Sequence, residues 1–382
     1  MKQVSKKILI SLNTAWNLLN FRAGLIEGLI SAGYQVIAIA PADEYVDKLK
    51  LLGCRFVHVE MDNQGTNPFS DLLLLWRYVR LFKTEVPDLC LFFTIKPNVY
   101  GSLASFFCGI PFINNVAGLG AVFIQGGFLK LFVSTLYKVA FKKSTKVFFQ
   151  NEDDRKLFLD KKLVSLALTD VLPGSGINLD WFSPKEARSR NSSNAPFRFL
   201  LIARMLKDKG IYEFVKAAQM LKEEGIESEF CLLGFLDVQN PSAISREQLK
   251  RWTDEGIVKY LGKSYDVREQ INQSDCIVLP SYREGTPRSL LEAAAMAKPI
   301  ITTNVVGCKE VVADGVNGLL CEAKNAVDLA LKMKAIFMLS DDQRILMGQN
   351  GRLKMEREFD EKIVVEKYLK AIGLELEVQP VP

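Results

Sequence analysis

Strand-like and helix-like segments alternate along this chain, and the alternation runs through the sequence twice. In the first half, short runs rich in β-branched and aromatic residues lie at 8–12, 35–40, 55–60, 89–94, 112–116 and 146–149. In the second half such runs lie at 197–203, 229–234, 258–261, 276–280 and 299–303. Helical patterns separate them, among them 21–32, 71–85, 211–224, 289–298 and a long one at 341–372. Because such alternation builds βαβ units, we expect each half to form a parallel sheet covered by helices.

A polar segment separates the two halves. Residues 187–196 carry few apolar side chains, which is typical of a linker. The sequence therefore predicts an α/β protein with two Rossmann-like, doubly wound domains. We place these domains at 1–185 and 186–355, and expect residues 356–382 to form a helix that returns to the first domain, followed by a tail. In such sheets ligands bind beyond the carboxyl ends of the strands.

The composition excludes several classes of protein. The chain has 382 residues, of which 48% are hydrophobic and 24% charged, so it is neither disordered nor collagen-like. Its seven cysteines are odd in number and form no CxxC motif, which favours a reduced, cytosolic protein. The single histidine, His58, argues against multi-histidine metal sites and a Ser-His-Asp triad, and we interpret it as a structural strand residue. The short apolar run after the basic N-terminus predicts a first strand and no signal peptide.

The net charge of +5 is concentrated in one stretch of the chain. Residues 120–150 contain no acidic residue and five lysines, namely Lys130, Lys138, Lys142, Lys143 and Lys146. A total charge this mild gives no reason to expect nucleic-acid binding. In a helix at 128–143, the residues Lys130, Ser134, Lys138 and Lys142 would form a basic stripe, opposite an apolar face of Phe128, Phe132, Leu136, Val139 and Ala140. Such a helix fits either a solvated surface or an anionic membrane surface.

Residues 97–129 contain no charged side chain at all. A membrane span and a buried α/β core with an active-site loop both fit this observation. Two prolines, several amides and repeated glycines interrupt the segment, which favours the buried core.

Two basic residues follow the first strand of the second half, where a phosphate group would bind. The familiar nucleotide motifs are absent from the sequence, since there is no P-loop and no complete dinucleotide fingerprint. Arg204 comes directly after the strand, and Lys209 follows five residues later, just before a helix. Arginine can bind a diphosphate with two hydrogen bonds, and lysine acts as a point charge. The alternative is that Lys207, Asp208 and Lys209 form a solvated turn.

Two carboxylates then flank a turn that could bind an anion. Glu284 lies on the loop after the strand at 276–280, and Gly285 would let a ligand approach the backbone closely. Ser289 is expected to cap the next helix, whose N–H groups would face an anion, with Glu292 in its first turn. The alternative is that Glu292 only offsets the helix dipole and that Glu284 is only a loop charge.

These residues resemble the retaining family 4 glycosyltransferases, which have the GT-B fold. The pattern Arg204-x4-Lys209 followed by Glu284-x7-Glu292 carries the resemblance, together with LPSYREGTPRSLLEAAAMAKPIITTNVVGCKEVV. In the first half, TIKPNVYGSLAS, INNVAGLGAVF and LPGSGINLDWF resemble the bacterial subgroup that extends undecaprenyl-diphosphate-linked sugars. That subgroup includes N-acetylgalactosaminyltransferases of N-glycan, O-antigen or capsule assembly. The resemblance covers nearly the whole chain.

The resemblance implies a role for each matching position. Arg204 and Lys209 would hold the donor diphosphate, Glu284 the donor sugar and Glu292 the ribose hydroxyls. The other donor-binding positions would be Lys263, Gly285, Thr286 and Ser289. In the first domain, the loop expected at 13–20 and the segment 116–120 would shape the acceptor site, with Asn13, Lys96, Asn98, Gly118 and Gly120 as its candidates. Many family members carry a histidine where this chain has Ala117.

The resemblance also implies a reaction and a place for it. We expect a sugar, an N-acetylhexosamine by resemblance, to pass from a UDP-sugar to a lipid-linked saccharide with retention of configuration. Because two cations and a helix end can stabilise the leaving group, we expect no cofactor and no metal. Asp153 and Asp154 open a helix and are interpreted as dipole partners. The lipid-linked acceptor favours a cytoplasmic enzyme held peripherally at the inner membrane face by Lys130, Lys138, Lys142 and Lys143. A catalytically silent GT-B scaffold and a sugar-nucleotide epimerase remain the alternatives.

Overall fold

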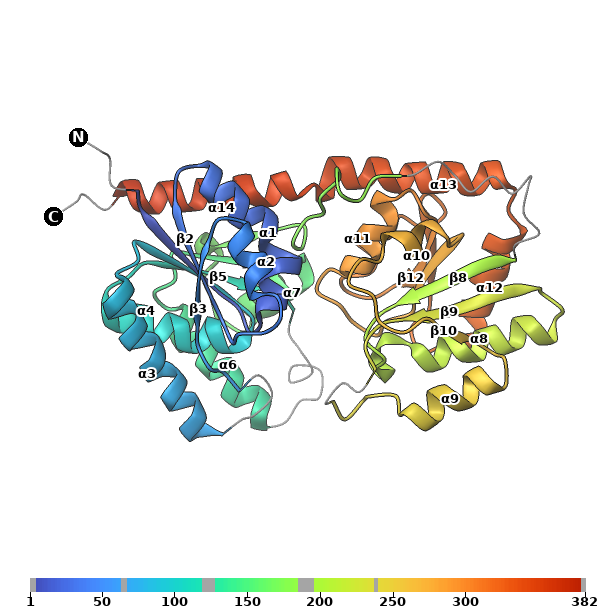
Figure 1. The fold of residues 1–382 in the computed structure, drawn as a ribbon, viewed down its shortest axis with the longest axis horizontal. Coiled ribbons are helices and arrows are strands. Elements are labelled where there is room, and N and C mark those ends of the chain that lie inside the picture. Colours follow the sequence, from blue (N-terminus) through green and yellow to red (C-terminus); the bar gives the residue numbers. More distant parts are fainter. Residues whose placement is uncertain (1–4, 63–66, 119–127, 185–195, 237–239, 379–382) are drawn as a thin grey trace. The chain divides into compact units, whose positions relative to one another are not determined.

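The computed structural model describes residues 5–62, 67–118, 128–184, 196–236 and 240–378 (Figure 1). The chain forms two compact units. The first unit contains residues 1–176 and 361–382, and the second contains residues 177–360. The chain therefore leaves the first unit after Gly176 and returns to it at Glu361.

The first unit is built on a parallel sheet of seven strands in the order β3-β2-β1-β4-β5-β6-β7. The strands are β1 (Lys7–Ser11), β2 (Gln35–Ala40), β3 (Arg55–His58), β4 (Leu89–Phe93), β5 (Phe112–Val116), β6 (Lys146–Phe149) and β7 (Thr169–Val171). The helices are α1 (Ala15–Ser31), α2 (Val46–Leu51), α3 (Pro68–Glu85), α4 (Ser102–Cys108), α6 (Phe128–Phe141), α7 (Glu152–Asp160) and α14 (Glu361–Val378), and a π-helical turn (Pro97–Gly101) precedes α4. The six strands predicted from the first half are confirmed.

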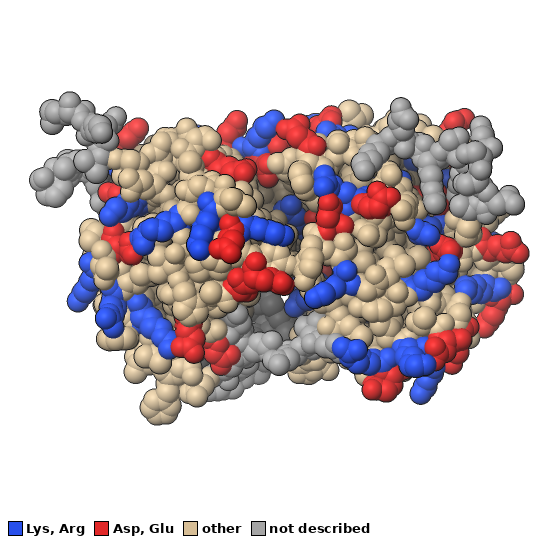
Figure 2. Space-filling model, viewed as in Figure 1, with Lys and Arg blue, Asp and Glu red and all other residues tan. Residues whose placement is uncertain are grey.

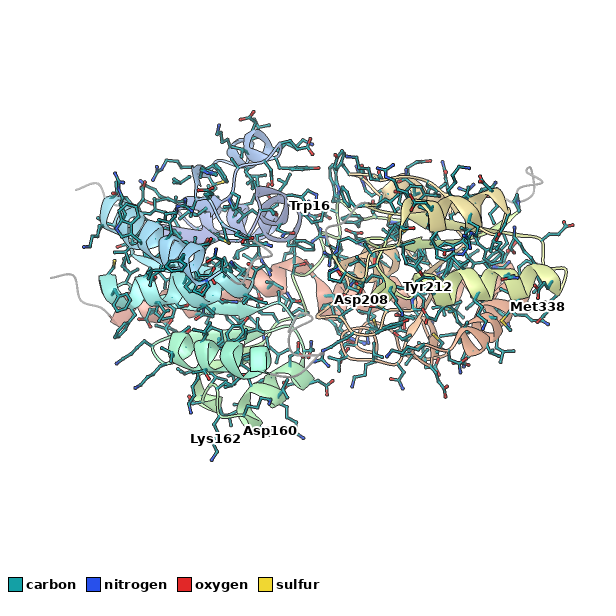
Figure 3. All side chains as sticks on the ribbon, turned by 90° about the horizontal axis from the view of Figure 1, so that it is seen from below. Trp16, Asp160, Lys162, Asp208, Tyr212 and Met338 are labelled. Carbon is teal, nitrogen blue, oxygen red and sulfur yellow. The ribbon has the colours of Figure 1, made fainter. Side chains whose placement is uncertain are left out.

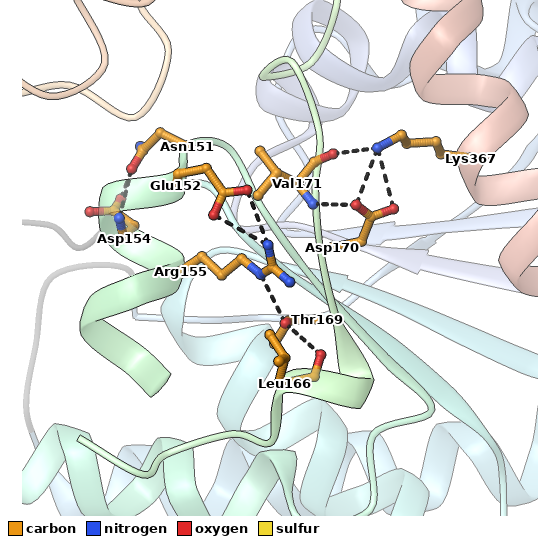
Figure 4. A network of polar contacts seen from close by, with 9 residues as sticks. All are labelled: Asn151, Glu152, Asp154, Arg155, Leu166, Thr169, Asp170, Val171 and Lys367. Atoms are coloured by element: carbon orange, nitrogen blue, oxygen red, sulfur yellow. Dashed lines mark hydrogen bonds and ion pairs between the residues drawn. The ribbon is translucent and has the colours of Figure 1, made fainter. Parts of the chain in front are cut away.

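Helix α14 completes the first unit, although it lies at the other end of the sequence. The ring of Tyr368 is buried, with centroids 6.0 Å from Phe93 and 4.8 Å from Phe148. Figure 4 shows a second attachment, in which Lys367 reaches the Asp170 carboxylate at 3.2 Å and the carbonyl of Val171 at 2.7 Å. The last helix is thus fixed to the sheet by aromatic packing and by a polar contact at β7.

The second unit contains a parallel sheet of six strands in the order β10-β9-β8-β11-β12-β13. The strands are β8 (Phe197–Ile202), β9 (Ser228–Leu233), β10 (Lys259–Tyr260), β11 (Cys276–Leu279), β12 (Ile300–Thr303) and β13 (Gly318–Cys321). The helices are α8 (Ile211–Glu223), α9 (Arg246–Asp254), α10 (Arg268–Asn272), α11 (Arg288–Ala295), α12 (Ala326–Met338) and α13 (Asp341–Lys354), with a 3-10 turn (Lys207–Lys209) and a π-helical turn (Met355–Phe359). The prediction of an α/β fold with two parallel sheets is confirmed.

Three predicted boundaries are wrong. Helix α1 begins at Ala15, so most of the loop expected at 13–20 is helical; the Thr14 hydroxyl caps the helix by accepting the Asn17 N–H at 3.0 Å. The long helix expected at 341–372 is interrupted at Asp360, whose backbone is non-helical (φ −57°, ψ 132°). Helix α14 continues to Val378, beyond the helix end predicted at residue 372.

Helix α6 packs on the core with a face that matches the predicted apolar face only in part: Ala140 is buried as expected. Tyr137 and Phe141 are buried against Phe158, and Ser134, expected on the basic stripe, is buried as well. Val139, expected on the apolar face, is 55% exposed. Because Tyr137 and Phe141 belong to the core, they are not available to insert into a membrane. No helix among the described residues combines the length and the apolar character that crossing a membrane requires.

Candidate active site

The predicted catalytic residues of the second unit follow two strands that are neighbours in the sheet. Strand β8 leads to Arg204 and Lys209, and strand β11 leads to Glu284. These strands pair directly, with Phe199 opposite Cys276. Strand order reverses between β8 and β11, because β9 lies on one side of this pair and β12 on the other. Ligands of doubly wound sheets bind at this switch point, beyond the carboxyl ends of the strands.

Lys209 and Glu284 form an ion pair at this switch point. The Lys209 Nζ lies 2.5 Å from Oε1 of Glu284, and each side chain is 14% exposed. The alternative in which residues 207–209 form only a solvated turn is therefore wrong for Lys209, although Lys207 and Asp208 are exposed. The sequence separates the two partners by 75 residues.

The backbone holds these two side chains at a fixed separation. The carbonyl of Asp208 accepts hydrogen bonds from the Ser281 hydroxyl at 3.1 Å and from the Tyr282 N–H at 2.9 Å. The N–H of Glu284 donates to the carbonyl of Val306 at 3.0 Å. The turn that carries Lys209 and the loop that carries Glu284 are thus fastened to each other, and sequence reasoning missed these contacts.

Two glycines allow the close approach of these loops. Gly210 has φ +74°, and a Cβ atom there would lie 2.1 Å from the carbonyl oxygen of Pro280. Gly307 has φ +87°, and a Cβ atom there would lie 2.5 Å from the carbonyl oxygen of Glu284. Only glycine fits such positions without displacing backbone, because the contacts are to main-chain atoms and the conformation is left-handed. A glycine directly after Lys209 was the available sequence signal.

Arg204 is more exposed than Lys209. Its side chain is exposed, and it forms no hydrogen bond or ion pair with the described residues. The structure therefore brings Lys209 and Glu284 together and leaves the Arg204 guanidinium in solvent at the end of the same strand. An exposed guanidinium in this position remains able to bind an incoming anion.

Helix α11 begins one residue earlier than predicted. Its N-cap is Pro287 and its first residue is Arg288, so the expectation that Ser289 caps the helix is wrong. Glu292 consequently lies beyond the first turn. The N-cap residue Pro287 makes no side-chain capping hydrogen bond.

Glu292 is instead paired with a residue that sequence reasoning did not single out. Arg288 lies one helical turn earlier, and its Nε donates to Oε1 of Glu292 at 3.0 Å. Burial raises the pKa of the Glu292 carboxyl, Arg288 acts to lower it, and the nearby Asp266 adds to the increase. The spacing i, i+4 on a helix was the signal that could have revealed the pair.

We expect Arg288→Ala to make stability more dependent on pH. Without the arginine the pKa of Glu292 should rise further, since Arg288 is the main group that lowers it. A carboxyl whose pKa is higher in the folded than in the unfolded state favours folding at a pH below its unfolded-state pKa. It loses this contribution as the pH rises through its folded-state pKa. Urea unfolding should therefore show a destabilisation of roughly 1.5–3 kcal/mol at pH 8 and less at pH 5. In a Glu292→Gln background the pH dependence of this difference should vanish; its persistence would contradict the pairing.

The turn 262–266 follows β10 and carries the remaining donor-binding candidate, Lys263. Its Nζ lies 5.3 Å from the ring centroid of Tyr265 and 5.9 Å from that of Phe235, which follows β9. Gly285 and Thr286 lie between Glu284 and α11 and are half-buried. These positions all belong to the carboxyl edge of the second sheet.

The first unit places its candidates at the equivalent switch point, between β1 and β4. Asn13 follows β1, and its side-chain oxygen accepts a hydrogen bond from Asn17 at 2.7 Å. Lys96 follows β4 and pairs with Asp71 at 2.6 Å, each side chain being 14% exposed. The hydroxyl of Tyr100 donates to the same carboxylate at 2.8 Å.

The other three candidates of the first unit have different surroundings. Asn98 is buried, donates to the carbonyl of Asn115 at 2.8 Å and accepts from the amide of Asn114 at 2.9 Å, so its side chain is used inside the unit. Gly118 has φ +141°, and Gly120 lies outside the described residues.

Two structural interpretations from the sequence are confirmed. His58 lies on β3, and its Nδ1 accepts the N–H of Ala42 at 2.9 Å. Asp153 and Asp154 lie in the first turn of α7, whose N-cap Asn151 accepts the Asp154 N–H at 2.8 Å (Figure 4).

The two doubly wound parallel sheets correspond to the GT-B fold, which solved structures share. A glycosyltransferase from Rickettsia africae covers 99% of this chain and 100% of its own, with a TM-score of 0.79 and 21% identity. The HepE protein of Anabaena, solved with UDP and glucose, covers 96% of this chain and 99% of its own, with a TM-score of 0.76 and 18% identity.

Sequence comparison identifies the family. Residues 183–354 match the family model of glycosyl transferases group 1, and residues 7–151 match that of glycosyl transferase 4-like proteins. The chain is 33% identical, over 92% of its length and 94% of the relative, to the N,N'-diacetylbacillosaminyl-diphospho-undecaprenol alpha-1,3-N-acetylgalactosaminyltransferase of Campylobacter jejuni. It is 27% identical, over 84% of its length and 85% of the relative, to the capsular polysaccharide glycosyltransferase CapM of Staphylococcus aureus. This chain belongs to the group 1 glycosyltransferases of family 4 and is related to enzymes of lipid-linked glycan and capsule biosynthesis.

Proposed function

We propose that this enzyme transfers an N-acetylhexosamine from a UDP-sugar to an undecaprenyl-diphosphate-linked saccharide, with retention of configuration. The observation that carries the proposal is the Lys209–Glu284 ion pair at the switch point of the second sheet. The Campylobacter jejuni relative and an Escherichia coli UDP-Gal:alpha-D-GlcNAc-diphosphoundecaprenol alpha-1,3-galactosyltransferase, 26% identical over 76% of both chains, support a lipid-linked acceptor.

The ion pair suggests how the donor is received. A nucleotide diphosphate carries more negative charge than one carboxylate, so it would draw Lys209 away from Glu284. Glu284 would then be free to accept hydrogen bonds from the hydroxyl groups of the donor sugar. Arg204 and the start of α11 would complete the diphosphate site, and Glu292, oriented by Arg288, would accept hydrogen bonds from the ribose.

The proposed reaction is a front-side displacement. The bond between the anomeric carbon and the diphosphate breaks, and the acceptor hydroxyl forms the new glycosidic bond on the same face. Its proton passes to an oxygen of the departing UDP. Lys209, Arg204 and the α11 amino end stabilise the charge that develops on the leaving group, as fixed donors commonly do in acyl and phosphoryl transfer.

The enzyme is further proposed to work at the inner face of the cell membrane. Lys138, Lys142 and Lys143 are exposed at the end of α6 and beyond it. The side chain of Lys130 lies outside the described part of the structure. Each such charge near an anionic leaflet adds roughly 1 kcal/mol to binding.

A panel of UDP-sugars with short, water-soluble polyprenyl-diphosphate-linked saccharides tests the proposal. We expect one N-acetylhexosamine donor to be used and its sugar to be joined to the acceptor. Conversion of the donor without acceptor would favour the epimerase, and absence of donor binding in calorimetry would favour the silent scaffold. The same assay with a chelator should proceed at an unchanged rate, because the charge stabilisation comes from the protein; inhibition reversed by Mg²⁺ or Mn²⁺ would contradict metal independence.

A further inference from the structure

Helix α3 presents large apolar side chains to solvent. Its core face is formed by Leu74, Tyr78 and Phe82, which are buried. On the opposite face four apolar side chains remain exposed, namely Phe69 (84%), Leu72 (64%), Leu73 (45%) and Trp76 (55%). Isolated exposed apolar residues are ordinary on protein surfaces, but a cluster on one helix face indicates an interaction site.

The apolar surface continues onto the neighbouring helix. Phe106 and Phe107 of α4 are 52% and 64% exposed, with their ring centroids 5.8 Å apart. Helix α3 packs on α4, and α4 in turn contacts α6. Figures 1 and 3 show α3, α4 and α6 side by side on the first unit. We call these exposed side chains of α3 and α4 the apolar docking face; they are Phe69, Leu72, Leu73, Trp76, Phe106 and Phe107.

Basic side chains border this face. On α3, Arg80 and Lys83 are exposed, and the Arg80 guanidinium lies 5.6 Å from the ring centroid of Trp76. Lys138 of α6 is also exposed, as are Lys142 and Lys143 just after that helix. On the side drawn in Figure 2, Lys and Arg side chains gather at the edge of the first unit near α3.

Acidic charge along the same helices is neutralised. The sequences of α3, α4 and α6 contain only two acidic residues, Asp71 and Glu85. Asp71 is paired with Lys96, and Glu85 is paired with Arg55. The apolar docking face is therefore bordered by positive charge that its own helices do not offset.

We propose that the apolar docking face inserts into the interfacial region of an anionic phospholipid leaflet. Tryptophan and phenylalanine favour this region of a bilayer, and lysine and arginine at its border bind the lipid headgroups. A second copy of the chain is disfavoured as the occupant, because two such faces would bring like charges together. The inference rests on the proposed peripheral attachment, and assigns its apolar part to α3 and α4 instead of α6, whose Tyr137 and Phe141 belong to the core.

Vesicle binding by the full-length protein tests the inference. We expect the wild type to bind phosphatidylglycerol–phosphatidylethanolamine vesicles at least tenfold more tightly than phosphatidylcholine vesicles. Phe69→Ser combined with Trp76→Ser should weaken binding to the anionic vesicles at least tenfold. Both side chains are largely exposed, so the thermal midpoint should stay within a few degrees of the wild type. The matched control is Leu331→Ser with Leu346→Ser, which removes two exposed apolar side chains from α12 and α13 of the second unit and should leave vesicle binding unchanged.

Several outcomes would overturn the inference. Unchanged vesicle binding by the α3 variant is one, and equal loss in the control variant is another. A wild-type dimer that the α3 variant converts to a monomer, without vesicle binding by either, would assign the face to a second copy of the chain.

Sugar-transfer assays measure the proposed activity separately from membrane docking. The α3 variant should transfer sugar to a water-soluble acceptor with kcat/KM within twofold of the wild type, and lose at least tenfold on an acceptor embedded in vesicles. If no donor and acceptor pair is turned over but the α3 variant still loses vesicle binding, the docking inference stands and the proposed function fails. Loss of activity on the soluble acceptor would contradict a role confined to membrane docking.

Discussion

Lys209→Ala is expected to lower kcat about 10²–10³-fold, the usual cost of removing one fixed charge-stabilising donor. The reason is the position of the ammonium group at the switch point of the second sheet, 2.5 Å from Glu284 and only 14% exposed. A cation held there by the backbone needs little reorganisation when charge develops on the leaving UDP. Initial rates at saturating donor and acceptor measure the change directly.

The neighbouring Lys207 provides the matched control. It lies in the same turn but is exposed, so Lys207→Ala should leave kcat within twofold of the wild type. Glu284→Gln should lower turnover more than it lowers UDP affinity, because the proposal assigns Glu284 to the sugar. Since Lys209 and Glu284 touch, the two losses should not add in the double variant. Near-normal turnover by Lys209→Ala would remove this lysine from the site.

The sequence predicts a strand reliably where both faces of that strand are buried, because burial on both faces produces a continuous apolar run. Strand β4 reads Leu-Cys-Leu-Phe-Phe and is buried throughout, as strands of a covered parallel sheet are. Two edge strands escaped prediction. β7 is three residues long and contains Asp170, and β13 has four residues beginning with Gly318. Their pairing with β6 and β12 defines them, and that long-range contact leaves no periodicity in the sequence.

The orientation of α6 could not be derived from its sequence for a related reason. Apolar residues occur on more than one side of this helix, so the pattern alone allows several faces. The ring of Phe158 on α7 packs on Tyr137 and Phe141 and selects the face that is buried. When a helix is apolar on two sides, the elements that pack against it determine which side is buried.

At the candidate site, the sequence suggested the residues but not their contacts. The spacings of Arg204 with Lys209 and of Glu284 with Glu292 resemble the family's pattern, and the segment that contains them matches the model of glycosyl transferases group 1. The direct contact of Lys209 with Glu284 depends on β8 lying beside β11, which is a property of strand order. The pair of Arg288 and Glu292 is local by contrast, and helical spacing would have been sufficient to predict it.

The site therefore depends on two kinds of support. Side chains supply the charges, whereas glycines and backbone hydrogen bonds set the distance between the loops that carry them. The carbonyl of Asp208 joins the two loops through Ser281 and Tyr282 (Figure 3 labels Asp208). A change that leaves every charged residue in place but separates these loops should then abolish activity as effectively as loss of Lys209.

Gly210→Ala is such a change, and we expect it to destabilise the second unit by roughly 2–5 kcal/mol. About 1–2 kcal/mol comes from placing a Cβ atom on a left-handed residue, and about 1–3 kcal/mol from overpacking. The overlap is with backbone, since the new Cβ would lie 2.1 Å from the Pro280 carbonyl oxygen, and φ is +74°. At about 2–4 °C per kcal/mol, the thermal midpoint should fall by roughly 4–20 °C.

Gly225→Ala separates the two contributions to this loss. Gly225 has nearly the same backbone conformation, with φ +77°, but no atom lies within 4 Å of its added Cβ. It should therefore lose only the conformational part, about 1–2 kcal/mol, and keep normal turnover. Gly210→Ala should in addition lose turnover at temperatures where it is still folded, because relief of the overlap shifts the turn that carries Lys209 relative to the loop that carries Glu284. Equal destabilisation of the two variants, with normal turnover in both, would show that the approach of Gly210 to Pro280 does not set the geometry of the site.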